Sequence, residues 1–220
     1  MRVAVYQLNK DRSKTEPILQ DEGMELSTAN AKLYDEVLNT ETDWEDLQEV
    51  VGNLLVNGHP LYRGEPHHVC DVIVMGDRAY FSGWMGYSEV NFDESKARKP
   101  DNLLRVVYVE PDKPSVEAEI LPDLDYLQQA VGGLLERVYN GDGTIIICNE
   151  EAKLNGMECN RRLSGGGVLA GPFFVVGDAG EDFRSLTDQE TQKYLQRFQE
   201  PERISWQEME ADMGFVFYSF

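Results

Sequence analysis

Alternating apolar and polar residues mark a series of short strands along the chain. The segment VCDVIVMGDRAYFSGW, residues 69–84, holds two β-prone runs separated by Gly76-Asp77, the pattern of a tight hairpin. Residues 2–8 predict an opening strand, and residues 87–92 predict another. In the second half we expect strands over LLRVVYVEPDKPSVEAEIL, TIIIC, PFFVVG and GFVFYSF.

Apolar residues follow helical spacing in four places. Ser27 is expected to cap a helix that runs to Leu38. Asp43 is expected to cap a second helix, WEDLQEVVGNLL, whose apolar side chains share one face. Further helices are expected over residues 123–139 and from Thr187, as the cap, to about residue 198.

The charged segment DESKARKPDN, residues 93–102, contains no large apolar side chain and is the best candidate for a linker. Strands and helices are mixed on both sides of it. The sequence therefore predicts an α+β protein of two small domains, each a short, mainly antiparallel sheet with one or two packed helices. We place the first domain at residues 1–95 and the second at residues 103–220.

Hydrophobic residues make up 41% of the 220 positions, which suffices for a packed core and is too rich for a disordered chain. No apolar run approaches the roughly 20 residues that span a bilayer. The first residues lack the apolar core of a signal peptide. Three cysteines are too few for a disulfide framework. We therefore expect a cytoplasmic protein.

Net charge is the strongest global feature, because 40 acidic residues against 20 Lys and Arg give −20. Such a field repels phosphate backbones and anionic membranes and attracts basic surfaces. Direct nucleic-acid binding needs clustered Lys and Arg and is not expected. Two interpretations remain: the charge serves solubility, or it imitates nucleic acid toward a basic partner.

Acidic residues are densest in two runs. On a helix, side chains three or four residues apart lie about 5–6 Å from each other, so a helical run predicts a row of charge comparable to DNA phosphates. The alternative is a solvated helix face whose first-turn carboxylates complement the helix dipole. The first run has five carboxylates and no intervening Lys or Arg: Glu41, Asp43, Glu45, Asp46 and Glu49. The second comprises Glu200, Glu202, Glu208, Glu210 and Asp212.

The segment ICNEEAKLNGMECNRRL, residues 147–163, is rich in groups that could hold phosphate or carboxylate. Asn at turns also bonds its own backbone, and Arg also pairs with nearby acids. Cys148 and Cys159 are too far apart in sequence for a zinc pair, and Asn155-Gly156 predicts a tiny hairpin in KLNGME. The candidate ligand-binding residues are Asn149, Asn155, Asn160, Arg161 and Arg162.

Two other runs do not predict a site. On a strand, His68 and Cys70 would face away from His67 and Asp71, so no shared metal is expected. The glycines at 165–167 lead into a strand, which offers no helix N-terminus for phosphate. Known catalytic motifs are also missing. We expect no enzymatic activity, no cofactor and no metal.

Residues 106 to about 198 resemble the domain-of-unknown-function family numbered 3846, through VVYVEPDKP, LQQAVGGLLERVY, IIICNEEAKLNG, AGPFFVVGD and EDFRSLTDQE. The first half resembles the YodL-like domain, through VCDVIVM, RAYF and GYSEV. Both resemblances imply an origin in gut bacteria, phages or conjugative elements, often near antirestriction genes. Neither implies a catalytic residue.

Charge and resemblance together predict a non-enzymatic accessory protein of a phage or mobile element. We expect it to inhibit a host defence nuclease, of the CRISPR or restriction type, by occupying a basic nucleic-acid-binding surface. The run from Glu41 to Glu49 would make the contact. The alternative is a module that binds a nucleotide or signalling molecule through residues 149–162.

Overall fold

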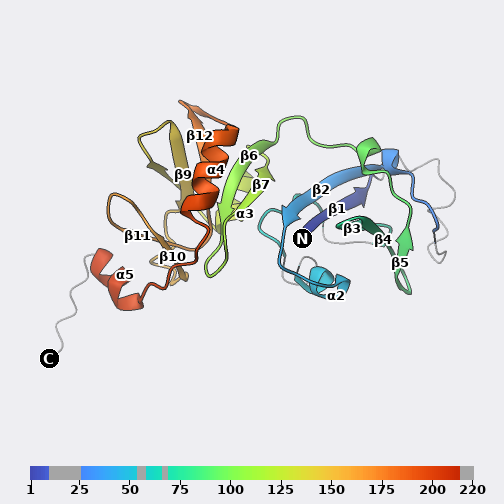
Figure 1. Ribbon diagram of the computed structural model, residues 1–220, viewed down its shortest axis with the longest axis horizontal. Helices are drawn as coiled ribbons and strands as arrows, with labels where there is room; N and C mark the ends of the chain where they lie inside the picture. Colours follow the sequence, from blue (N-terminus) through green and yellow to red (C-terminus); the bar gives the residue numbers. More distant parts are fainter. Residues whose placement is uncertain (10–25, 54–57, 66–68, 214–220) are drawn as a thin grey trace. The chain divides into compact units, whose positions relative to one another are not determined.

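The computed structural model describes residues 1–9, 26–53, 58–65 and 69–213 (Figure 1). The chain divides into two compact units, Met1–Asp101 and Asn102–Phe220. Both units combine antiparallel sheets with short helices, which confirms the predicted α+β class. The histidines at 67 and 68 and the expected strand at 214–220 lie outside the described residues.

The first unit is built on a sheet of five strands in the order β2-β1-β3-β4-β5. The predicted hairpin is confirmed, because Met75 pairs with Arg78 across a turn in which Gly76 has φ of +60°. Glycine adopts this conformation without steric cost. The strands are β1 (Arg2–Leu8), β2 (Tyr34–Glu41), β3 (Val72–Met75), β4 (Arg78–Gly83) and β5 (Gly86–Val90).

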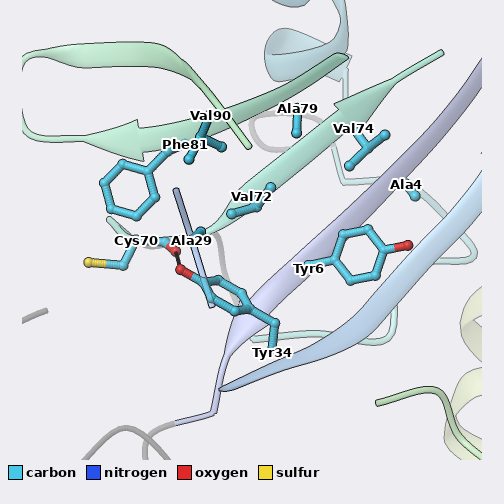
Figure 2. Packing of buried hydrophobic residues seen from close by; sticks show 10 residues of the cluster. All are labelled: Ala4, Tyr6, Ala29, Tyr34, Cys70, Val72, Val74, Ala79, Phe81 and Val90. Carbon is cyan, nitrogen blue, oxygen red and sulfur yellow. Dashed lines mark hydrogen bonds between the residues drawn. The ribbon is translucent and has the colours of Figure 1, made fainter. Parts of the chain in front are cut away.

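One face of this sheet carries a compact hydrophobic core (Figure 2). Alternate residues of β1 and β3 point into it, as the period of two in a strand requires. Tyr34 reaches across the core, and its hydroxyl donates a 3.0 Å hydrogen bond to the Cys70 carbonyl. The core residues are Ala4, Tyr6, Ala29, Tyr34, Cys70, Val72, Val74, Ala79, Phe81 and Val90.

The predicted helix from Ser27 to Leu38 is wrong. Its only helical part is the single 3-10 turn η2 (Ala31–Leu33), after which β2 begins. On one side β2 pairs with β1, and on the other the Glu36 amide donates to the Arg98 carbonyl. Helix propensity is a weak preference that these long-range pairings override.

The predicted linker is mostly part of the first unit. It contains the 3-10 turn η4 (Glu94–Lys96). The Glu94 carboxylate accepts bonds from the Arg2 guanidinium at 2.9 Å and the Tyr6 hydroxyl at 2.5 Å. Arg98 lies beside β2. The division between the units lies inside the predicted linker, near its end, between Asp101 and Asn102.

The second unit is built on a larger antiparallel sheet, in the order β7-β6-β12-β9-β8, with β13 added to β12. The strands expected around the Pro-rich turn, over TIIIC and over PFFVVG are confirmed. The strands are β6 (Leu104–Val109), β7 (Val116–Ile120), β8 (Leu135–Tyr139), β9 (Thr144–Asn149), β12 (Phe173–Ala179) and β13 (Asp182–Arg184).

Two helices, α3 (Leu124–Val131) and α4 (Asp188–Arg197), contact this sheet on opposite faces. Val107 of β6 belongs to the core cluster that includes Tyr194 of α4. Its neighbour Tyr108 donates a 3.0 Å hydrogen bond to the Ala130 carbonyl of α3. Because adjacent strand residues point to opposite faces, the sheet is covered on both sides.

The third predicted helix is shorter than expected, since α3 ends at Val131 rather than near Tyr139. Gly132 and Gly133 follow with φ of +75° and +159°. These conformations suit glycine and end the helix in the left-handed cap that many helices share. The remaining residues form β8, which pairs with β9.

A separate two-stranded sheet with one helix completes the second unit. The hairpin of β10 (Cys159–Arg162) and β11 (Val168–Ala170) turns at the glycine run, and these glycines lead into a strand as predicted. The helix α5 (Trp206–Asp212) packs on it through the buried Met209. Among the described residues, no helix is long and apolar enough to cross a membrane.

Candidate functional site

The first acidic run, residues 41–49, is called the acidic segment below, and it connects β2 to the helix α2 (Leu47–Val51). The predicted cap, Asp43, is wrong: Asp46 caps α2, and its carboxylate accepts the Glu49 amide at 2.9 Å. The Glu49 carboxylate in turn accepts the Glu45 amide at 2.8 Å. Two of the five acids therefore stabilise the start of the helix.

The expected row of carboxylates on one helix is not formed, because only Glu49 lies within α2. Glu41, Asp43 and Glu45 instead alternate with half-buried residues in the chain before the helix. Trp44, one of these, packs edge-on against His59 with 6.1 Å between ring centroids. The intervening carboxylates all remain exposed.

No described Lys or Arg of the first unit neutralises the acidic segment. All five of its carboxylates are exposed, and within the described part of the chain no Lys or Arg forms an ion pair with any of them. Like charges this close raise the local negative potential. The segment is a strip of accessible negative charge.

The second acidic run differs, because most of it is paired internally. Arg162 joins Glu208 and Glu202, with 2.7 Å from Nε to Oε1 of Glu208 and 2.7 Å from Nη1 to Oε2 of Glu202. The Arg162 bond lowers the pKa of Glu208. Asp212 pairs with Lys153 at 2.6 Å, which lowers the pKa of that carboxyl. This run fastens α5 to the hairpin rather than presenting free charge.

The asparagines of the 149–162 loop serve mainly to hold the backbone. Asn149 is buried, donates to the Gly132 carbonyl at 2.9 Å and accepts the Glu151 amide at 2.8 Å. Asn160 is buried too, and it donates to the carbonyls of Val109 and Gly171 at 3.1 and 2.8 Å. Such side chains replace missing main-chain partners.

Arg161 is fully buried, which the sequence did not indicate. Its Nη2 donates to the carbonyls of Lys113 at 2.8 Å and Phe198 at 2.9 Å. Its Nη1 donates to Asn160 Oδ1 at 2.8 Å. Burial lowers the pKa of the guanidinium. Arg161 joins the turn after β6 to the end of α4 and has no surface to offer a ligand.

The tiny hairpin predicted in KLNGME is wrong. Residues 150–156 form a compact turn in which Gly156 has φ of +69° and Asn155 donates its amide to the Glu151 carbonyl at 2.9 Å. Only Asn155 and Arg162 are accessible among the five candidate ligand residues, and Arg162 is held by acids. These contacts do not favour the small-ligand alternative.

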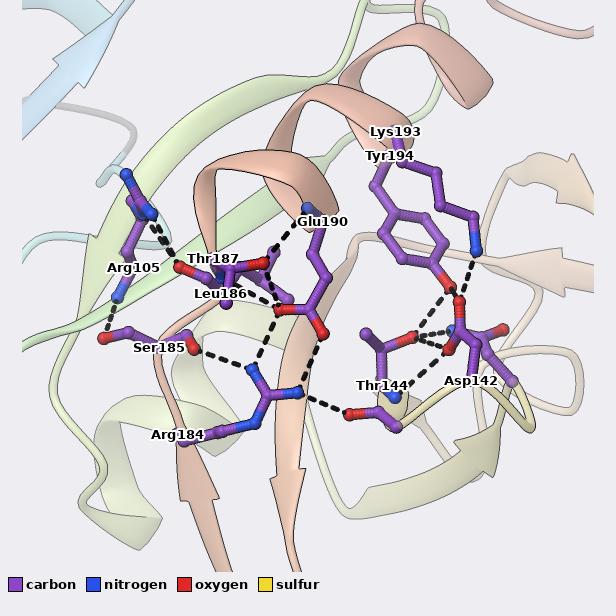
Figure 3. A network of polar contacts seen from close by, with 12 residues as sticks. Arg105, Asp142, Thr144, Arg184, Ser185, Leu186, Thr187, Glu190, Lys193 and Tyr194 are labelled. Carbon is purple, nitrogen blue, oxygen red and sulfur yellow. Dashed lines mark hydrogen bonds and ion pairs between the residues drawn. The ribbon is translucent and has the colours of Figure 1, made fainter.

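A polar network between α4 and the strand ends escaped the sequence analysis (Figure 3). Asp142 accepts bonds from Thr144 at 2.6 Å, Tyr194 at 2.9 Å and Lys193. Partial burial opposes the charged form, but these donors outweigh it and lower the pKa of Asp142. Every charged member has an opposite partner. The network therefore fixes the first turns of α4 on the sheet.

The cysteines are poorly placed for chemistry. Cys148 is buried, and burial raises the pKa of its thiol to about 12. Cys70 is also buried, in the core of the first unit. Among the described residues, no three His, Cys, Asp or Glu side chains are arranged to hold a metal ion.

The larger sheet with its two helices forms a small α+β domain, and part of the chain that includes it matches a known family model. Residues 104–199, from β6 through α4, match the family described as Domain of unknown function (DUF3846). The predicted resemblance of the second half is thereby confirmed. No curated protein and no solved structure matches the chain.

Proposed function

We propose that this protein is a non-enzymatic acidic accessory protein of a phage or mobile element that inhibits a host defence nuclease. The nuclease, of the CRISPR or restriction type, would be blocked at its basic nucleic-acid-binding surface. The acidic segment of the first unit makes the contact. One observation carries the proposal: five exposed carboxylates in this segment lack an ion-pair partner among the described residues.

The inhibition follows from competition between carboxylates and phosphates. A basic channel arranges Lys and Arg to neutralise a row of phosphates, so a fixed strip of carboxylates competes for the same groups. Glu41, Asp43 and Glu45 occupy alternate positions in the chain, and their half-buried neighbours orient them outward. A strip held in this way loses little conformational entropy on binding.

Two further points support the proposal. The net charge of −20 disfavours nucleic acid and favours basic proteins as partners. The first half resembles the YodL-like domain, whose relatives and those of the 3846 family occur in mobile elements near antirestriction genes. This shared genomic neighbourhood is an association and does not itself specify a mechanism.

The test measures DNA cleavage by a panel of purified CRISPR and restriction nucleases, with and without the protein. We expect inhibition of at least one nuclease, relief by added duplex DNA, and weakening as salt rises from about 50 to about 300 mM. Because exposed charges mainly steer encounter, neutralising the strip should slow association rather than speed dissociation.

The decisive variant is Glu41→Gln, Asp43→Asn and Glu45→Gln combined, which leaves the capping residues of α2 unchanged. We expect it to need a roughly tenfold higher concentration for the same inhibition. The matched control removes equal charge from exposed acids of the second unit: Glu117→Gln, Glu150→Gln and Glu181→Gln. No inhibition of any nuclease, or equal inhibition by both triple variants, would contradict the proposal.

A further inference from the structure

The strand β8 is an edge of the larger sheet, because it stands last in the strand order and pairs only with β9. The Leu134 carbonyl, just before β8, accepts the Glu150 amide. The Asn140 amide, just after β8, donates to the Thr144 carbonyl. In an antiparallel pair the direction of the backbone groups alternates from residue to residue, so even-numbered residues here face β9. The residues whose amides and carbonyls face outward are Leu135, Arg137 and Tyr139.

These outward groups have no backbone partner within the described part of the chain. The strand also lacks the usual protection of an edge, since it contains no proline and its pairing with β9 has no bulge. The cation in its middle, Arg137, lies over the Phe183 ring with 4.6 Å from Cζ to the ring centroid, so its charge is directed toward β13. The edge of β8 is therefore open to another strand.

A cavity of about 160 Å³ lies beside the same strand. Glu136 and Val138 both line it, as expected for residues two apart, which point to the same face of a strand. An apolar cavity of roughly 150 Å³ can hold a benzene-sized group, so this one has room for one aliphatic side chain. The apolar part of its wall includes Val138, Ala152, Leu163, Val168 and Leu169.

The open edge and the cavity together determine which side chains an added strand should carry. A strand paired with β8 continues the sheet, so its alternate side chains lie on the face of Glu136 and Val138. The side chain opposite Val138 can enter the cavity if it is aliphatic. Glu136 is exposed and forms no ion pair with a described Lys or Arg, so a cation is favoured opposite it.

A second copy of this chain fits the edge poorly. Each copy has a net charge of −20, and antiparallel pairing of two β8 strands would bring a second Glu136 to the same face. We propose that β8 binds an extended segment of a partner protein, in which an aliphatic residue and a Lys or Arg are separated by one residue. This binding site belongs to the second unit and does not depend on the proposed nuclease inhibition.

The experiment titrates the full-length protein, labelled with nitrogen-15, with the peptide acetyl-TTLTKTT-amide. Antiparallel pairing places its leucine opposite Val138 and its lysine opposite Glu136. We expect saturable shifts with a dissociation constant on the order of 1 mM. Hydrogen exchange should slow at the three outward amides and stay unchanged at Glu136 and Val138, which already face β9. The matched peptide acetyl-TTSTETT-amide, with neither the aliphatic side chain nor the cation, should not saturate.

One pair of variants tests the edge itself. Arg137→Pro removes an outward N–H and leaves the bonds between β8 and β9 in place, because that amide does not face β9. Arg137→Ala is the matched control, since it loses the same side chain and keeps the amide. We expect Arg137→Pro to weaken peptide binding by roughly tenfold or more relative to Arg137→Ala.

A charge exchange tests the position opposite Glu136. In Glu136→Lys the preference should reverse, so that acetyl-TTLTETT-amide binds more tightly than the lysine peptide. Four results would overturn the proposal: no saturable shift in the wild type, equal binding of the two matched peptides, an unchanged preference in Glu136→Lys, or equal affinity of Arg137→Pro and Arg137→Ala with native spectra.

Discussion

Arg184 and Glu190 form a two-pronged ion pair, with Nη1 to Oε2 and Nη2 to Oε1 both at 2.8 Å. The same carboxylate accepts the amide and the hydroxyl of Thr187, the cap of α4. Arg184 also donates to the Gly143 carbonyl at 3.0 Å. Through Arg184, Glu190 thus connects the start of α4 to the end of β13 and to the residue before β9 (Figure 3).

This pair makes stability depend on pH. The Arg184 bond, helped by Thr187, lowers the pKa of Glu190 from 4.5 to about 2. A depressed carboxyl pKa stabilises the fold above the unfolded value and loses that effect as pH falls from about 4.5 toward about 2. Glu190→Gln should cost roughly 0.5–1 kcal/mol at pH 7, since the pair is partly exposed.

Urea denaturation of the wild type and Glu190→Gln at pH 7 and pH 3 measures this effect. The difference in unfolding free energy should be largest at pH 7 and should shrink at pH 3. Glu181→Gln, at an exposed position, is the control and should show no such change. A difference that stays constant between the two pH values would rule out the ion pair as its source.

Arg161 is buried and Arg162 is exposed, so replacing each by Met should destabilise the second unit to different extents. Arg161→Met keeps most of the volume but leaves the carbonyls of Lys113 and Phe198 without donors. Each unsatisfied buried carbonyl costs about 1–3 kcal/mol, so the second unit should lose about 3 kcal/mol. Arg162→Met should be clearly milder. Chemical denaturation compares them, and equal losses would refute this division.

The two aspartates before α2 should also differ. Asp46→Ala removes the acceptor of the Glu49 amide and should destabilise α2 by about 1 kcal/mol. Asp43→Ala should have no measurable effect on the helix. Hydrogen exchange of the Val50 amide, which donates to the Asp46 carbonyl at 3.1 Å, reports the local opening. Faster exchange in Asp43→Ala than in Asp46→Ala would reverse the assignment.

The two ends of the predicted linker should differ in their sensitivity to proteolysis. A protease that cuts before aspartate can act at Asp93 or Asp101. Asp101 lies in an exposed turn, whereas Asp93 adjoins the Glu94 contacts with Arg2 and Tyr6. We expect cleavage at Asp101 first, and Glu94→Ala should expose Asp93. Mass spectrometry of the early fragments identifies the site, and initial cleavage at Asp93 in the wild type would contradict this expectation.

Local signals in the sequence predict those elements whose cause is local. Gly76-Asp77 demands a tight turn, and Thr187 with Glu190 forms the capping box that starts α4. The predicted hairpin and the predicted start of α4 are confirmed because neighbouring residues determine each of them. The two-glycine stop at Gly132 was equally local but was overlooked, because the apolar pattern of β8 continues the helical one.

Elements whose cause is distant in the sequence could not be predicted in this way. β2 is a strand because β1 and Arg98 supply its partners. Arg161 looks like a surface arginine until the carbonyls of Lys113 and Phe198 appear beside it. The two acidic runs have similar sequences, yet among the described residues only the second forms ion pairs with Lys or Arg. Those cations, Arg162 and Lys153, lie about 50 positions earlier in the chain. Amino-acid composition alone does not show whether a charged residue is buried, paired or exposed.

The position of β12 in the larger sheet has a consequence for how the second unit acquires its structure. β12 lies between β6 and β9 and pairs with both, although it follows both in the chain. Before it is made, β6 and β9 have only their hairpin partners, β7 and β8. Such hairpins expose apolar faces and open strand edges, and distant pairing is slow. We therefore expect the sheet to form only once Phe173–Ala179 has left the ribosome, so this one strand determines when the apolar faces leave water.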